Sequence, residues 1–320
     1  MPSLKEIKNR IASVNSKRKI TSAMKMVASS KLHHAQVMIS NMLPYEEMLE
    51  HILKTFIASD VDVKAYLGNA REVKRAAVLV FSSNSALCVG FNANGIKRMQ
   101  KTVEDYKARG VEVTVYPVGR KVAEKAQKLG YTIAGNFNHL ADKPNSSECI
   151  AIGGEFIANY MSGQVDEVCM IYHHFKSAGS QVLTKKPLIH IDLEEAMDYD
   201  HYRDLKSTIA TEQSMKYLQE HAQEREYKNE KGSKLNSNFI VEPDMETVLT
   251  MLIPRYINLM VYTALLDSNA SEHAARMVAM QTATDNADEL LRLLKLQYNK
   301  SRQQAITSEL LDIVGGTVNN

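Results

Sequence analysis

The sequence predicts an α/β protein in which the two ends of the chain form a long antiparallel coiled coil and the middle forms a Rossmann-like, mainly parallel α/β domain. Two observations lead to this prediction. Apolar residues recur at alternating steps of three and four near both ends of the 320-residue chain, a spacing typical of coiled-coil helices. Between the ends, short apolar runs alternate with helical patterns, which indicates parallel strands joined by crossover helices.

The C-terminal part, from Pro254 to Val314, is predicted to be one long helix. No glycine or proline occurs between Arg255 and Val314, and at 1.5 Å per residue such a helix spans roughly 90 Å. Its apolar stripe needs partners in water, so it is either a core helix of a bundle or a shaft held by other chains. Gly315 and Gly316 are expected to end it. The stripe consists of Leu259, Thr263, Leu266, Ala270, Met277, Met280, Thr284, Ala287, Leu291, Leu294, Tyr298, Ser301 and Ala305.

Residues 3–58 predict a second long helix, which is the expected partner of the first. Its seam runs from Leu4 to Val14, from Ile20 to Val27 and from Ala35 to Phe56, with a change of phase between the segments. Pro44 is expected to kink or interrupt the third segment. The two ends of the chain should therefore pair as an antiparallel coiled coil.

The middle of the chain alternates between strand and helix patterns. The run from Ala76 to Phe81 is continuously apolar, as in a buried parallel strand. The last two strands are close enough in sequence to form an antiparallel pair. Strands are expected at Ala76–Phe81, Val111–Val118, Tyr131–Phe137, Val165–Phe175 and Ser180–Ile191, and helices at Asn92–Arg109, Arg120–Leu129 and Ser146–Met161, the last capped by Ser146 or Ser147.

Four parts follow from these patterns. They are an N-terminal coiled-coil helix (residues 1–58), an α/β domain (71–192), a polar insertion or linker (193–242) and a C-terminal coiled-coil helix (243–320). Asp244 is placed to cap a helix at the start of the last part, and Pro254 is expected to interrupt that helix before the long one.

The sequence gives no sign of catalytic, cofactor or metal chemistry. It contains neither the GxGxxG nor the GxxxxGK[ST] motif, and the turn from Ser82 to Asn92 lacks a lysine for a phosphate. No histidine lies near Cys88 in sequence. The pairs His33-His34 and His173-His174 are adjacent, so their side chains should point in different directions rather than chelate a metal.

Composition and charge set further bounds. The net charge is +2, and three cysteines without CxxC spacing fit a reducing compartment. No run of 18 apolar residues occurs, so any membrane association is expected to come through partners. The first 31 residues carry eight basic residues against one acidic residue. This charge suits a nucleic acid or an acidic protein surface, but no aromatic residue precedes Tyr45 to stack on bases.

Several blocks in both ends of the chain resemble one family. They are Lys5-Glu6-Ile7, Arg10–Val14, Lys19–Ala28, Ser271–Met280, Ala283–Ala287, Tyr298–Leu310 and Ile313–Gly316. In this order they are similar to the γ subunits of bacterial F-type ATP synthases. The stretch Ser85-Ala86-Leu87-Cys88-Val89-Gly90 departs from that family, which usually has Arg-Gly before Leu-Cys and two glycines after it.

The resemblance implies a central rotor shaft without chemistry of its own. Such a subunit stands inside a ring of three α and three β subunits and contacts the ε subunit and the c-ring. It transmits torque between the proton-driven c-ring and the catalytic β subunits. The resemblance also implies a peripheral protein at the cytoplasmic face of the bacterial inner membrane, with no cofactor and no nucleic acid bound.

The resemblance also assigns roles to residues. Met24, Lys25 and Arg276 match the level where the shaft meets an acidic helix-turn-helix of β, and Gln303 and Thr307 match the upper contacts with α and β. Three apolar residues near the tip, Ile306, Leu310 and Ile313, match the apical bearing. Leu87, Cys88 and Gly90 belong to the turn of the α/β domain.

Alternatives to this interpretation are a coiled-coil adaptor, with or without nucleic-acid binding through the basic N-terminal arm, and an enzyme with a nucleotide in the doubly wound domain. The polar stretch from Leu205 to Asn238 is longer than expected for the resembled family, and this extra length is interpreted either as a contact with the ε subunit or c-ring or as a solvated decoration.

Overall fold

A computed structural model describes residues 3–58, 72–189 and 241–318 of the chain. They fall into two compact units. One contains residues 1–30 and 276–320, and the other contains residues 31–275. The predicted polar insertion, residues 193–242, lies outside the described residues except for its last two positions.

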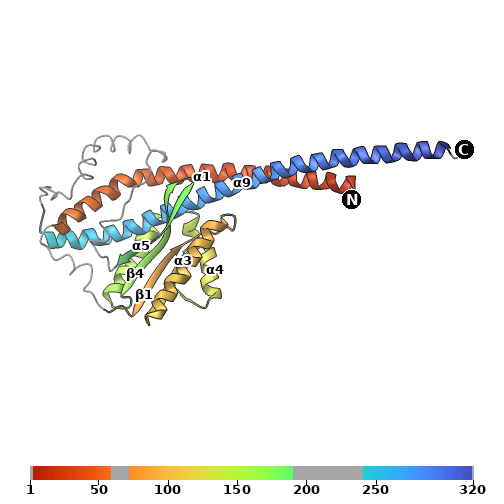
Figure 1. Cartoon of the computed structure of the whole chain (residues 1–320). Helices are drawn as coiled ribbons and strands as arrows, with labels where there is room; N and C mark the ends of the chain where they lie inside the picture. Colours follow the sequence, from red (N-terminus) through yellow and green to blue (C-terminus); the bar gives the residue numbers. More distant parts are fainter. Residues whose placement is uncertain (1–2, 59–71, 190–240, 319–320) are drawn as a thin grey trace. The chain divides into compact units, whose positions relative to one another are not determined.

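Two long helices run through the ends of the chain (Figure 1). They are α1 (Leu4–Ala58) and α9 (Met245–Val318). The prediction of long terminal helices is confirmed. The expected interruption at Pro254 and the expected end at Gly315 and Gly316 are wrong, since these residues lie inside α9, and Pro44 lies inside α1 without interrupting it. A proline frees the carbonyl four residues earlier; for Pro254 this is Thr250, which is exposed, so water can reach the carbonyl.

Helix α9 begins at the predicted cap. The Thr247 backbone N–H and hydroxyl donate to the two carboxylate oxygens of Asp244, each at 2.8 Å. These hydrogen bonds lower the pKa of the Asp244 carboxyl, because they favour its charged form.

The middle of the chain forms a five-stranded sheet with the order β3-β2-β1-β4-β5. Strand β1 pairs in parallel with β2 and β4, and β4 pairs with β5 in antiparallel fashion, as predicted. The strands are β1 (Arg75–Phe81), β2 (Glu112–Val118), β3 (Thr132–Ile133), β4 (Glu167–Ser177) and β5 (Ser180–Ile189). The expected strand Tyr131–Phe137 is shorter, because the chain turns at Gly135, whose φ is +74°.

Helices cover both faces of the sheet (Figure 1). Helices α3 (Val89–Ala108) and α4 (Arg120–Lys128) pack on one face, against Ala76, Val78 and Val80 of β1. Helices α5 (Ser146–Met161) and α9 pack on the other, against Ala77, Leu79 and Phe81. Successive residues of β1 thus enter two different cores, as the alternation of side chains along a strand requires.

Two local features differ from the sequence expectation. Asn145 caps α5, with its side chain accepting from the Ser147 N–H at 3.0 Å, so neither Ser146 nor Ser147 is the cap. A short 3₁₀ helix, η1 (Asn138–Ala141), begins directly after the expected third strand and brings the Ala141 carbonyl toward α9.

Within the described residues, α9 is long and apolar enough between Glu246 and Leu311 to cross a membrane by length and composition alone. Half of the most apolar window is buried inside the protein. A buried core helix meets the same two criteria, so they do not distinguish a core helix from a membrane span.

Candidate functional site

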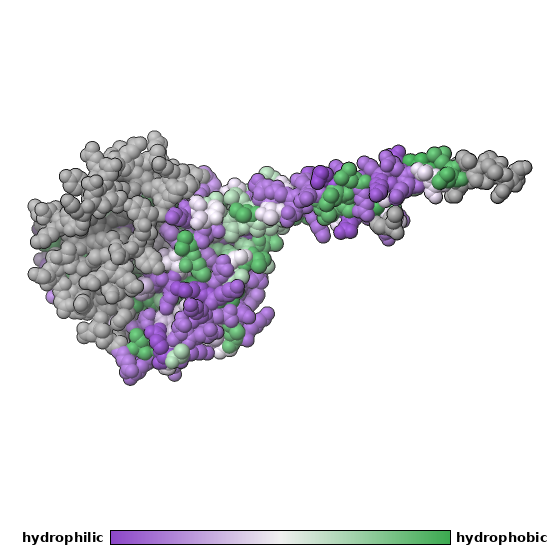
Figure 2. All heavy atoms as spheres, in the orientation of Figure 1, coloured by the Kyte–Doolittle hydropathy of each residue, from purple (hydrophilic) through white to green (hydrophobic). Residues whose placement is uncertain are grey.

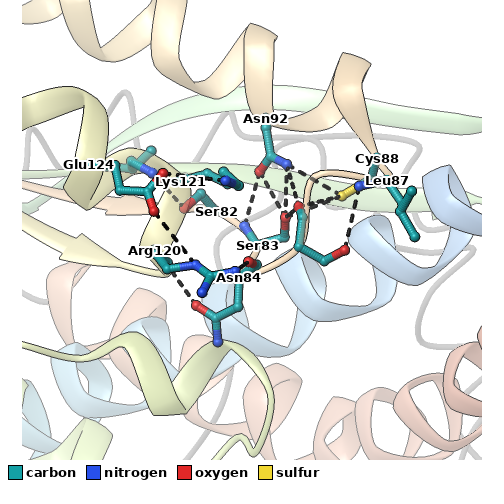
Figure 3. Close-up of polar contacts among 11 residues, drawn as sticks. Ser82, Ser83, Asn84, Leu87, Cys88, Asn92, Arg120, Lys121 and Glu124 are labelled. Carbon is teal, nitrogen blue, oxygen red and sulfur yellow. Dashed lines mark hydrogen bonds and ion pairs between the residues drawn. The ribbon is translucent and has the colours of Figure 1, made fainter.

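The turn after β1 lies at the carboxyl end of the sheet, where doubly wound domains bind ligands. Figure 3 shows Ser83, Asn92 and Cys88 joined in one polar network. The Ser83 N–H donates to Asn92 Oδ1 at 3.1 Å, and the Asn92 amide donates to the Ser83 hydroxyl at 2.8 Å. The Cys88 thiol lies 3.2 Å from the same hydroxyl. The network fixes the turn against the first helical turn of α3.

The three residues predicted for this turn have different environments. Cys88 is buried, Leu87 is 42% exposed, and Gly90 lies in the first turn of α3 with open space where a Cβ would be. Gly90 is absent from the positive-φ glycines of the described chain, so this position does not require glycine. Gly119 does, since its φ is +107° and a Cβ there would lie 2.2 Å from the Ser82 carbonyl oxygen.

The same turn occupies the N-terminus of α4 (Figure 3). The Arg120 N–H donates to Asn84 Oδ1 at 2.9 Å, the Lys121 N–H to the Ser83 carbonyl at 3.2 Å, and the Val122 N–H to Ser82 Oγ at 3.1 Å. These are the backbone donors that a helix N-terminus offers to a phosphate. Because the chain itself satisfies them, the arrangement does not support a nucleotide site here.

The three cysteines are buried thiols. None of them forms a disulfide. Burial raises the pKa of the Cys149 thiol to about 12 and that of the Cys169 thiol to about 11. Thiolates are the nucleophiles and metal ligands, so neither group is prepared for that chemistry at neutral pH. Among the described residues, no cluster of three His, Cys, Asp or Glu side chains could hold a metal.

The adjacent histidines point in different directions, as expected for neighbours on a strand. His173 stacks on Phe91 of α3 with ring centroids 4.3 Å apart. His174 donates from Nδ1 to Asp267 Oδ2 of α9 at 2.7 Å. Burial lowers the pKa of the His173 imidazole to about 4.

In the unit formed by residues 1–30 and 276–320, α1 and α9 make two specific side-chain contacts. The Arg18 guanidinium lies 2.8 Å from an oxygen of Asp288, and the hydroxyls of Thr21 and Thr284 are also 2.8 Å apart. From the first contact to the second, the residue number rises by three along α1 and falls by four along α9. The helices are antiparallel in this unit, which confirms that part of the coiled-coil prediction.

Three of the predicted contact residues lie beside this helix pair. Met24 is one turn beyond Thr21 and is 38% exposed. Lys25 and Arg276 are both half-buried. The Met24 side chain is therefore accessible, whereas Lys25 and Arg276 are partly covered by the protein itself.

The remaining predicted contacts lie near the end of α9. Gln303 and Thr307 are exposed, and the Thr307 hydroxyl donates to the Gln303 carbonyl at 2.9 Å. Ile306 and Leu310 are 44% and 57% exposed, while the side chain of Ile313 lies outside the described residues. Figure 2 shows apolar patches in green between hydrophilic surface along this end of the chain. Exposed apolar side chains at regular positions indicate a surface that another chain covers.

A buried polar stretch of α9 was missed by the sequence reasoning. Thr263, Asp267, Asn269 and Ser271 all lie inside the unit formed by residues 31–275, and three of them bond to the α/β domain. The available signal was the run of polar residues from Asp267 to His273, interrupted only by Ala270, which does not fit a helix with one apolar stripe.

Comparison with known proteins gives matches over nearly the whole chain. A family model described as ATP synthase matches residues 3–318. An ATP synthase gamma chain from Phocaeicola vulgatus is 48% identical over 319 residues, which cover 99% of this chain and 100% of the relative. A gamma chain from Bacteroides thetaiotaomicron is 46% identical over the same shares of the two chains. Because both relatives are matched over their full length, the stretch Leu205–Asn238 does not make this chain longer than they are.

Two solved structures share the fold. A chain from the structure of the central stalk and c-ring of the Tetrahymena thermophila mitochondrial ATP synthase superposes with a TM-score of 0.53 at 22% identity, covering 82% of this chain and 99% of the other. A chain of the Euglena gracilis mitochondrial ATP synthase superposes with a TM-score of 0.59 at 19% identity, covering 98% of this chain and 93% of the other. At these identities the likeness establishes the fold alone.

Proposed function

Because this chain belongs to the ATP synthase gamma chain family, we propose that it is the central rotor shaft of a rotary ATP synthase and transmits torque between an ion-driven c-ring and the catalytic β subunits. The observation that carries the proposal is the antiparallel pair of helices in the unit formed by residues 1–30 and 276–320. Its exposed apolar side chains need a partner in water. They include Ile20, Met24, Val27, Val278, Leu293, Ile306 and Leu310.

The partners of this proposal are three α and three β subunits around one copy of the chain, with the ε subunit and the c-ring at its α/β domain. The similar Tetrahymena chain comes from a structure of a central stalk together with a c-ring, which supports the c-ring as one of these partners. We place the chain at the cytoplasmic face of the bacterial plasma membrane, attached through its partners. In this assembly the eight basic residues within the first 31 positions face acidic surfaces of β.

The chain is proposed to have no catalytic role. The turn after β1 satisfies the backbone donors of α4 with its own groups, and burial raises the pKa values of Cys149 and Cys169. The residues proposed to contact the ring are Met24, Lys25, Arg276, Gln303 and Thr307, with Ile306, Leu310 and Ile313 as the apical bearing.

Co-expression with the α and β subunits of the same organism tests the proposal. We expect a complex with one copy of this chain per three α and three β, whose sustained ATP hydrolysis requires the chain. Omission of the chain is the control. A chain that purifies alone, well folded and indifferent to α and β, would contradict the proposal.

A further inference from the structure

Helix α9 is buried on all sides over twelve consecutive residues, from Thr263 to Ala274. A helix that packs on one side of a domain normally keeps an exposed polar face. This stretch has none, yet more than half of it is polar. The buried polar residues are Thr263, Asp267, Ser268, Asn269, Ser271, Glu272 and His273.

Three of these residues bond directly to the α/β domain. Asp267 Oδ2 accepts from His174 Nδ1 at 2.7 Å, and the Ser271 hydroxyl donates to the His173 carbonyl at 3.0 Å, so both hold α9 to β4. The Asn269 side-chain amide donates to the Ala141 carbonyl of η1 at 2.8 Å. All of these groups belong to the unit formed by residues 31–275.

The three contacts are distributed around the helix. At about 100° per residue, Ser271 lies roughly 40° from Asp267 on the helix circumference, whereas Asn269 lies roughly 200° from it. The contacts to β4 and the contact to η1 therefore hold opposite sides of the same helical turn. A rotation of α9 about its own axis moves all three donors and acceptors apart.

We propose that Asp267, Asn269 and Ser271 form a torsional anchor, which locks α9 against rotation relative to the α/β sheet and so passes torque from that domain into the helix. The proposal deepens the rotor function proposed above and depends on it. Apolar packing alone allows neighbouring arrangements of ridges and grooves at similar energy. Buried hydrogen bonds do not allow such alternative arrangements at similar energy, because each displaced polar group would be left without a partner away from water.

Variants that keep side-chain size but remove the bonds test the anchor. Asn269→Leu removes the contact to η1, and Ser271→Ala removes one contact to β4. Thr263→Val is the matched control, since Thr263 is buried in the same stretch but its hydroxyl bonds to the Met260 carbonyl of its own helix. Each variant is made alone and the first two also together, in the complex co-expressed with α and β.

The measurement is the angular fluctuation of a bead on the α/β domain, with the α and β subunits fixed to a surface and stalled by a non-hydrolysable nucleotide. The bead is attached through Lys101→Cys on the exposed side of α3, because the three native cysteines are buried. We expect the angular variance to rise about twofold in the double variant, less in each single variant, and not at all in Thr263→Val.

The outcomes separate the anchor from the rotor function. An unchanged variance in Asn269→Leu and Ser271→Ala, with normal assembly and rotation, overturns the anchor and leaves the rotor proposal standing. A wild-type chain that neither assembles nor rotates with α and β overturns the rotor proposal and the anchor with it. If the double variant does not assemble, the two single variants decide the question.

Discussion

Asn258 of α9 lies against Gly153 of α5 so closely that a Cβ on residue 153 would be 2.1 Å from Asn258 Oδ1. The neighbouring Gly154 has open space at the same position. Only one of the two adjacent glycines is therefore required by the approach of the helices.

Gly153→Ala is expected to destabilise the protein by about 1–3 kcal/mol, because the added methyl group displaces the Asn258 side chain and lies tightly, at 3.3 Å, against the Asn258 Cα. Gly154→Ala is the matched control and should be neutral or slightly stabilising, since alanine favours a helix over glycine. Thermal unfolding of the purified chain measures both. Equal midpoints for the two variants would show that the helices do not approach this closely.

Acid is expected to destabilise the protein through His173. Its folded pKa of about 4 lies below the ordinary value near 6.5, so folding favours the neutral ring. The stabilisation is complete above pH 6.5 and is lost as the pH falls through 4, with an upper bound of about 3 kcal/mol. His173→Phe should flatten the dependence of the unfolding free energy on pH between 6.5 and 4. A slope that survives in His173→Phe belongs to other groups.

Alkali is expected to act through the buried thiols. The folded pKa values of Cys149 and Cys169, about 12 and about 11, lie above the ordinary value near 8.5. The contribution of these two thiols to the free energy of unfolding is therefore complete below pH 8.5 and is lost as the pH rises through 11 and 12. Cys149→Ala should reduce this alkaline slope. In the native wild type at pH 8, iodoacetamide should modify neither thiol, and rapid labelling of either one would show that it is accessible.

Met24→Lys is expected to impair coupling while leaving stability nearly unchanged, within about 0.5 kcal/mol, because the side chain is 38% exposed. The added cation lies beside Lys25, at the surface proposed to meet β. We expect fewer ions pumped per ATP hydrolysed in the reconstituted enzyme. Met26→Lys introduces the same charge on the opposite side of α1 and should have a smaller effect on this ratio. A normal number of ions pumped per ATP in Met24→Lys would show that residue 24 does not contact β.

The long helices could be predicted because their signal is local. The steps of three and four along α1 and α9 are visible in the sequence, as is the apolar run of β1. The interruption expected at Pro254 was wrong and Pro44 does not interrupt α1, because a proline costs a helix one hydrogen bond, which the packing of a helix of 55 or 74 residues can offset. Strand β3 was predicted too long because the chain leaves the extended conformation at Gly135, whose φ is +74°.

The contacts of the buried polar stretch could not be predicted, because they join residues far apart in sequence. Asn269 bonds to Ala141 and Asp267 to His174, 128 and 93 positions away. The sequence shows that this stretch lacks an apolar face, but only the fold shows which groups form hydrogen bonds with its polar side chains. Met24 in the helix pair shows the reverse, because its position in the predicted seam from Ile20 to Val27 favoured a covered side chain, whereas the side chain is 38% exposed.

The turn that caps α4 has a consequence for the motions of the sheet. In doubly wound domains that bind ligands, the ligand lies at the carboxyl edge of the sheet. Here the amides of Arg120, Lys121 and Val122 donate instead to Asn84, Ser83 and Ser82 of the chain itself. This edge should exchange its amide hydrogens as slowly as the strands behind it, so the domain keeps the shape of a binding protein but responds to load as a stiff body.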